Sequence, residues 1–122
     1  MGHKASMRVL IAGRDRELQM LGAEVVKLSG MHPITPGSTE EAAAAIWTTE
    51  LDALVLCYSL PNKDAIFVAE LFRQFHPQGC VVAITNHTIP DRQIAADARI
   101  PSTTGPDAII AAIKQKCAVR AA

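Results

Sequence analysis

The chain has 122 residues, 49% of them hydrophobic, and its 12 basic and 12 acidic side chains give a formal net charge of zero. A chain of this size forms about one ordinary domain with one core, and no second domain is expected. The balanced charge excludes a nucleic-acid-binding surface built from a field of Lys and Arg. No apolar run approaches the ~20 residues of a membrane span, and no signal-peptide pattern precedes the first apolar segment.

The ends and the cysteines give two further expectations. Residues 1–6 are polar and patternless, so we interpret them as a remnant of recombinant production and residues 7–120 as the single domain. Cys57, Cys80 and Cys117 are an odd number of cysteines without metal-ligand spacing. This pattern favours reduced thiols in a reducing compartment, which predicts a cytoplasmic protein with Cys80 and Cys117 in its core.

The segment 53–57, Ala-Leu-Val-Leu-Cys, contains no charge. Such a run is typical of a central parallel strand that helices cover on both faces. Pro61 cannot donate a backbone hydrogen bond and restrains Leu60 to extended geometry, so the strand is expected to end near Cys57. Because the functional groups of open α/β sheets lie at the carboxyl ends of the strands, Cys57 is predicted to lie at the functional edge.

Apolar runs and helical periodicity alternate along the rest of the chain. Strands are predicted at 8–12, 32–35, 53–57, 80–84 and 99–101, with 32–35 at a sheet edge because Pro33 interrupts it. Helices are predicted at 18–28, 38–46, 64–75 and 91–98, and from a start within 104–107 to 120. Right-handed crossovers then give a three-layer αβα sandwich, a flavodoxin-like (βα)5 fold with a parallel sheet in the order 2-1-3-4-5.

These segments resemble the receiver domain of two-component response regulators. The resemblance covers nearly the whole chain, and it is carried by Arg8-Val-Leu-Ile-Ala12, Gly30 to Ala42, Leu54-Val-Leu-Cys-Tyr-Ser-Leu-Pro61, Asp64 to Arg73 and Val81 to Thr85. It implies the doubly wound fold and a role in signal transduction.

The family's chemistry is matched less well than its fold. In the family two adjacent acids hold Mg²⁺, an aspartate accepts a phosphoryl group, and a Thr or Ser and a Lys complete the site. The resemblance places the acidic pair on Gly13 and Arg14, the phosphoacceptor on Cys57, the switch hydroxyl on Thr85 and the lysine near Ser102. Of these residues, Thr85 alone is of the family's type.

This departure predicts a degenerate receiver, or pseudo-receiver. Glycine, guanidinium and thiolate do not supply the oxygen ligands that Mg²⁺ needs, so no metal and no cofactor are expected. Without the carboxylate no acyl phosphate forms, and without the metal and the lysine nothing offsets the phosphoryl charge. The chain is therefore predicted to have no catalytic residues and not to be an enzyme.

Two residues after the first strand have open interpretations. The Arg14 guanidinium could sit where the cation would lie and hold one switch-like state, or Arg14 could be a solvated loop residue. A shift of the alignment by one would bring Asp15 into the site, although a single carboxylate facing a cysteine does not rebuild it.

Cys57 and Thr85 also have two interpretations each. Cys57 could be a redox switch or nucleophile with Thr85 and His87 nearby, or a small hydrophobe in the space that a carboxylate left. Thr85 could point its hydroxyl into the pocket or satisfy a neighbouring carbonyl group.

Two functions follow from these expectations. The first is a phosphorylation-independent signalling module that binds a protein partner or a second copy of itself, and that regulates an attached or separate output domain. The alternative is a small thiol-redox or ligand-binding α/β protein that uses the pocket around Cys57, Thr85, His87 and Ser102. Neither function requires the domain to contact nucleic acid or a membrane.

Overall fold

A five-stranded parallel sheet forms the centre of the molecule. The computed structural model describes residues 7–86 and 94–121. The strand order is β2-β1-β3-β4-β5, as predicted. The strands are β1 (Arg8–Ala12), β2 (His32–Ile34), β3 (Ala53–Leu56), β4 (Cys80–Thr85) and β5 (Ala98–Pro101).

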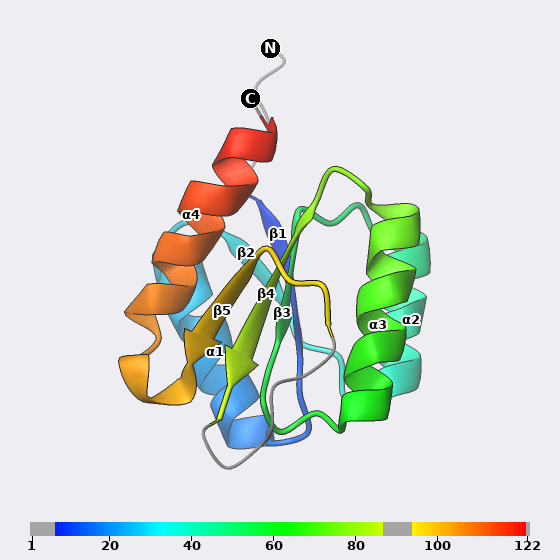
Figure 1. Ribbon diagram of the computed structural model, residues 1–122, viewed down its shortest axis with the longest axis horizontal. Coiled ribbons are helices and arrows are strands. Elements are labelled where there is room, and N and C mark those ends of the chain that lie inside the picture. The colour runs from blue at the N-terminus through cyan, green and yellow to red at the C-terminus, as the bar shows by residue number, and fades with distance from the viewer. Residues whose placement is uncertain (1–6, 87–93, 122) are drawn as a thin grey trace.

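Helices cover both faces of this sheet and complete the predicted three-layer sandwich (Figure 1). Helices α1 (Arg16–Leu28) and α4 (Asp107–Ala121) lie on one face, and α2 (Thr39–Thr48) and α3 (Asn62–Phe75) lie on the other. A short 3₁₀ helix, η1 (Ser102–Thr104), connects β5 to α4. None of the helices in the described ranges is long and apolar enough to cross a membrane.

Local hydrogen bonds explain where the helices begin. The Asp15 carboxylate accepts from the backbone N–H groups of Glu17 and Leu18, which caps α1. The Ser38 hydroxyl accepts from the Glu41 N–H at the start of α2, which is the spacing of a capping box. These side chains satisfy donors that the first turn of a helix leaves without partners.

Two cores follow from the two faces of the sheet. The core under α1 and α4 includes Val55, Cys57 and Ile113, and the core under α2 and α3 includes Leu54, Leu56 and Phe72. Neighbouring residues of β3 therefore point into different cores, as expected for a strand that is buried on both sides.

The predicted edge strands both form. Strand β2 lies at one edge, paired with β1 alone, and accommodates Pro33 there. Strand β5 pairs with β4 over four residues up to Pro101, so the short fifth strand is confirmed.

The helix predicted at 91–98 is wrong in the part that the structure describes, since residues 94–97 are not helical and Ala98 begins β5. Residues 91–93 lie outside the described residues. The segment is tied to its neighbours instead: the Arg73 guanidinium donates to the Ala95 carbonyl at 2.6 Å, and the Asp97 carboxylate accepts from the Val81 N–H at 2.8 Å. These contacts hold the chain extended beside the sheet, and they replace the helix.

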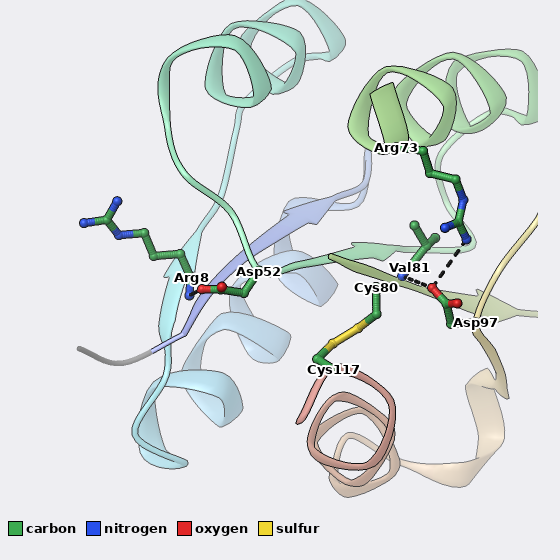
Figure 2. Close-up of a disulfide and its surroundings, with 7 residues drawn as sticks. All are labelled: Arg8, Asp52, Arg73, Cys80, Val81, Asp97 and Cys117. Atoms are coloured by element: carbon green, nitrogen blue, oxygen red, sulfur yellow. Dashed lines mark hydrogen bonds and ion pairs between the residues drawn. A yellow bond between two sulfur atoms is a disulfide. The ribbon is translucent and has the colours of Figure 1, made fainter. Parts of the chain in front are cut away.

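The expectation of three reduced thiols is also wrong, because Cys80 and Cys117 form a disulfide (Figure 2). Their Cα atoms lie 5.4 Å apart, although 37 positions separate them in the sequence. Cys80 begins β4 and Cys117 belongs to α4, which packs against β4. Both residues are buried, so their predicted place in the core is confirmed.

Candidate functional site

The carboxyl ends of β1 and β3 bring Gly13 and Cys57 together. The two strands are paired up to Ala12 and Leu56, and the Cys57 N–H donates to the Ala12 carbonyl at 2.8 Å. The two loops that follow therefore leave the sheet side by side. Cys57 is only 5% exposed, which places its thiol in the interior, where cysteine is commonly found.

Gly13 is in close contact with Cys57. A Cβ atom built on Gly13 would lie 2.7 Å from the Cys57 Cβ and 3.0 Å from its Sγ. Side-chain carbon atoms do not approach so closely, and the obstructing Cβ is fixed to the backbone. In this arrangement, residue 13 has no room for a side chain, and Cys57 occupies the space that an acidic side chain would need.

Ser59 was not among the predicted site residues, yet it joins the two loops. Its hydroxyl accepts hydrogen bonds from the N–H groups of Arg14 and Asp15, both at 3.0 Å. The Leu60 N–H donates to the Cys57 carbonyl at 3.1 Å, which closes a turn around Ser59. The signal in the sequence is a serine inside a short turn that ends in proline, because such hydroxyls bond to nearby backbone groups.

The side chains of Arg14 and Asp15 are directed away from Cys57 toward helix starts. The Arg14 guanidinium lies 3.5 Å from the Asp64 carboxylate in the first turn of α3, and the Arg14 side chain is 67% exposed. The Asp15 carboxylate caps α1. This geometry favours the solvated interpretation of Arg14, and it argues against Asp15 as an acid facing the thiol.

The other predicted site residues have separate places. The Thr85 hydroxyl lies 3.5 Å from the Ile100 carbonyl oxygen, to which it donates a long hydrogen bond, as in the second of its two interpretations. Ser102 begins η1 and lines a hollow that Cys57 also lines. His87 lies outside the described residues, so its proximity to Cys57 stays a prediction.

The residues at this edge do not fit Mg²⁺. This ion requires oxygen ligands in near-octahedral geometry. Gly13 has no side chain, Cys57 offers sulfur, and the Asp15 carboxylate already accepts two backbone N–H groups. Within residues 7–86 and 94–121, no group of three His, Cys, Asp or Glu side chains could hold a metal ion.

Comparisons with known proteins identify the fold. Neither the protein-family models nor the curated proteins contain a match to this sequence. Among solved structures, the chain resembles a response regulator receiver domain protein from Methanospirillum hungatei JF-1, with a TM-score of 0.84, 17% identity, and coverage of 96% of this chain and 98% of that chain. It also resembles a response regulator receiver protein from Sinorhizobium medicae WSM419, with a TM-score of 0.76, 18% identity, and coverage of 94% and 97%.

A third similar structure carries a ligand. It is the response regulator protein TrrA from Thermotoga maritima in complex with Mg²⁺ and BeF, with a TM-score of 0.75, 20% identity, and coverage of 89% of this chain and 97% of that chain. All three similarities extend over almost the whole chain. The protein therefore has the fold of response-regulator receiver domains.

Proposed function

We propose that this chain is a phosphorylation-independent signal-transduction module. It is an atypical receiver domain that acts by protein–protein interaction, either with a partner protein or with a second copy of itself. It regulates an output domain that is attached to it or separate from it. It performs no catalysis and binds neither Mg²⁺ nor nucleic acid.

The contact between Gly13 and Cys57 carries this proposal. In the resemblance to the receiver family, these two positions correspond to an acid that holds the metal and to the phosphoacceptor. A residue with no side chain packs against a buried thiol at this place, so neither position carries a carboxylate that could hold a metal or accept a phosphoryl group. The fold supports the signalling role, and the residues at its edge support the loss of phosphorylation.

Beryllofluoride with Mg²⁺, which mimics the phosphoryl group, tests the proposal. We expect ¹H–¹⁵N NMR spectra of the full chain to keep the Thr85 and Cys57 amide signals in place when both are added. A conventional receiver domain in the same buffer serves as the positive control. A saturable shift at Thr85 would show a working phosphorylation site and overturn the proposal.

The interaction itself is tested by molecular mass in solution and by capture of a partner. Light scattering at increasing concentration reveals a homodimer if the second copy is the partner. A strictly monomeric chain that also retains no protein from its source would contradict the interaction role.

A second candidate function is supported by one observation, the hollow that both Cys57 and Ser102 line. Of the two versions of this alternative, the hollow supports ligand binding. For thiol-redox chemistry the described residues supply weaker support, since Arg14, the cationic residue that the resemblance places beside Cys57, is paired with Asp64 at the surface. The cytoplasmic location stays a prediction, and the disulfide removes the argument from reduced cysteines that supported it.

A further inference from the structure

An apolar hollow lies between α1, α4 and the carboxyl half of the sheet. Its volume is about 130 Å³. Aliphatic side chains from four strands form its floor and those of α1 and α4 its sides, and the set comprises Ile11, Leu18, Leu21, Val26, Val55, Ile84, Ile100 and Ile109. Leu21 is 55% exposed, so the hollow reaches the surface beside it.

Gly22 widens this hollow from the middle of α1. A Cβ built on Gly22 would meet no atom within 4 Å, whereas one built on Gly13 or Gly79 would lie 2.7 Å from a neighbour. Gly22 also lacks the positive φ angle of Gly30 and Gly105. Neither close packing nor backbone conformation therefore requires a glycine here, although glycine is a poorer helix former than alanine by about 1 kcal/mol.

The chemistry of the walls defines what the hollow would accept. Among residues 7–86 and 94–121, no charged side chain lines it, and the polar side chains of its lining are those of Cys57, Tyr58 and Ser102. A charged ligand would lose its hydration there without a compensating partner. A neutral apolar ligand would lose only unfavourable contact with water.

The volume of the hollow limits the size of the ligand that it can hold. An engineered protein cavity of about 150 Å³ lined by Leu, Ile and Phe binds benzene. The hollow here is of similar volume and similar lining, and it is too small to receive a helix of a partner protein, which is about 10 Å wide.

We propose that this hollow is a binding site for a small neutral apolar molecule with the dimensions of a single aromatic ring. The ligand would contact α1, α4 and the buried face of β3 together, beside the Cys57 side chain. The inference deepens the ligand-binding alternative and rests on that alternative alone. It does not require the domain to be phosphorylation-independent.

Benzene is the probe for this site. We expect benzene to shift the ¹H–¹³C NMR signals of the Leu21, Val55 and Ile109 methyl groups of the intact chain in a saturable manner. It should also slow alkylation of Cys57 by N-ethylmaleimide, because the occupied hollow would block access to the thiol.

Gly22→Leu fills the hollow and should weaken benzene binding at least tenfold. Met20→Leu is the matched control, since Met20 lies on the same helix, is 46% exposed and is not part of the lining. It should leave the affinity unchanged. Gly22→Ala is the substitute test if Gly22→Leu does not fold. It adds a single methyl group without a clash, so it keeps the fold and should weaken benzene binding by a smaller factor.

The absence of methyl shifts at saturating benzene would overturn this proposal. Equal shifts in the wild type and in Gly22→Leu would overturn it as well, because the ligand would then lie elsewhere. These outcomes are independent of the beryllofluoride experiment, whose result concerns the metal and phosphoryl site at Thr85 and Cys57.

Discussion

The two ends of the parallel strands are built in different ways. We call the side of the sheet where the strands begin the amino edge, and the side where they end the carboxyl edge. At the amino edge, specific bonds join segments that are distant in the sequence. The Asp52 carboxylate accepts from the Arg8 N–H at 2.8 Å, and the disulfide joins Cys80 at the start of β4 to Cys117 in α4 (Figure 2). Directly before β5, the Asp97 carboxylate contacts the Arg73 guanidinium of α3 at 3.4 Å.

At the carboxyl edge, the contacts also join segments that are distant in the sequence, but among the described residues none of them is covalent. A glycine packs against a cysteine, and one serine hydroxyl joins two loops through a pair of backbone N–H groups. The apolar hollow lies at this same edge. In the receiver family this is the edge that carries the phosphorylation chemistry.

This difference indicates that the contacts which stabilise the fold lie mainly at the amino edge, whereas the candidate functional residues lie at the carboxyl edge. A covalent bond and hydrogen-bonded carboxylates hold the amino edge, so the architecture does not depend on metal-binding acids at the carboxyl edge. The TM-score of 0.84 to a receiver domain at 17% identity is consistent with this separation. Changes at the amino edge should therefore lower stability most, and changes at the carboxyl edge should be smaller and more local.

Removal of the disulfide should have the largest effect. Cys117→Ala opens a loop of 37 residues, and we expect the free energy of unfolding to fall by about 2–4 kcal/mol because the unfolded chain gains conformational freedom. Urea denaturation without reductant measures the change. The wild type in dithiothreitol should reach the same midpoint as the variant.

Reductant itself is the matched control for this experiment, since it should leave the midpoint of Cys117→Ala unchanged. If the variant and the oxidised wild type unfolded at equal urea concentrations, the amino edge would not owe its stability to the bridge.

At the carboxyl edge, Gly13→Ala should have the next largest effect. The added Cβ would lie 2.7 Å from the Cys57 Cβ, and such overpacking costs about 1–3 kcal/mol. The double variant with Cys57→Gly should recover part of this loss, because the obstructing Cβ is gone. Thermal unfolding of both single variants and the double variant gives the coupling energy.

Gly22→Ala is the control for the change from glycine to alanine, because its Cβ meets no atom within 4 Å. It should raise stability by up to about 1 kcal/mol through better helix propensity. Additive effects of Gly13→Ala and Cys57→Gly would show that the two residues do not compete for space.

Hydrophobic runs in the sequence predict most of the fold. The strand 8–12 is found at the predicted bounds, and 53–57 ends one residue earlier than predicted. Both are buried strands whose pattern does not depend on distant contacts. The helix predicted at 91–98 fails in its described part because Arg73 of α3 and the Val81 N–H of β4 bond to Ala95 and Asp97 and hold that segment extended.

The candidate site is less predictable because it depends on which loops meet. The sequence places Cys57 at a strand end, but the contact with Gly13 and the bridge through Ser59 require the pairing of β1 with β3. The disulfide likewise requires α4 to lie on β4, which the spacing of Cys80 and Cys117 does not reveal.

Ser59→Ala tests the bridge between the two loops. The N–H groups of Arg14 and Asp15 lose their common acceptor, but both are partly accessible to water, so we expect a loss of about 1 kcal/mol. Hydrogen exchange of these two amides should become faster, whereas that of the Leu54 amide in the sheet should not change. Ser59→Thr keeps the hydroxyl and should keep their protection. Unchanged exchange at residues 14 and 15 in Ser59→Ala would show that the hydroxyl does not hold the loops.

Arg14→Ala should have the smallest effect and distinguishes the two interpretations of this residue. The Arg14 side chain is 67% exposed and its ion pair with Asp64 spans 3.5 Å, so its removal should change the free energy of unfolding by less than about 0.5 kcal/mol. Arg73→Ala is the matched control, because the Arg73 side chain is 33% exposed and its guanidinium also bonds to the Ala95 carbonyl. The free energy of unfolding should fall clearly more in Arg73→Ala than in Arg14→Ala in the same urea titration.

If Arg14→Ala were instead the more damaging variant, or if it shifted the amide signals of Cys57 and Thr85, the guanidinium would be acting as a fixed cation at the carboxyl edge. The carboxyl edge would then hold a fixed positive charge from a side chain, as in the first interpretation of Arg14.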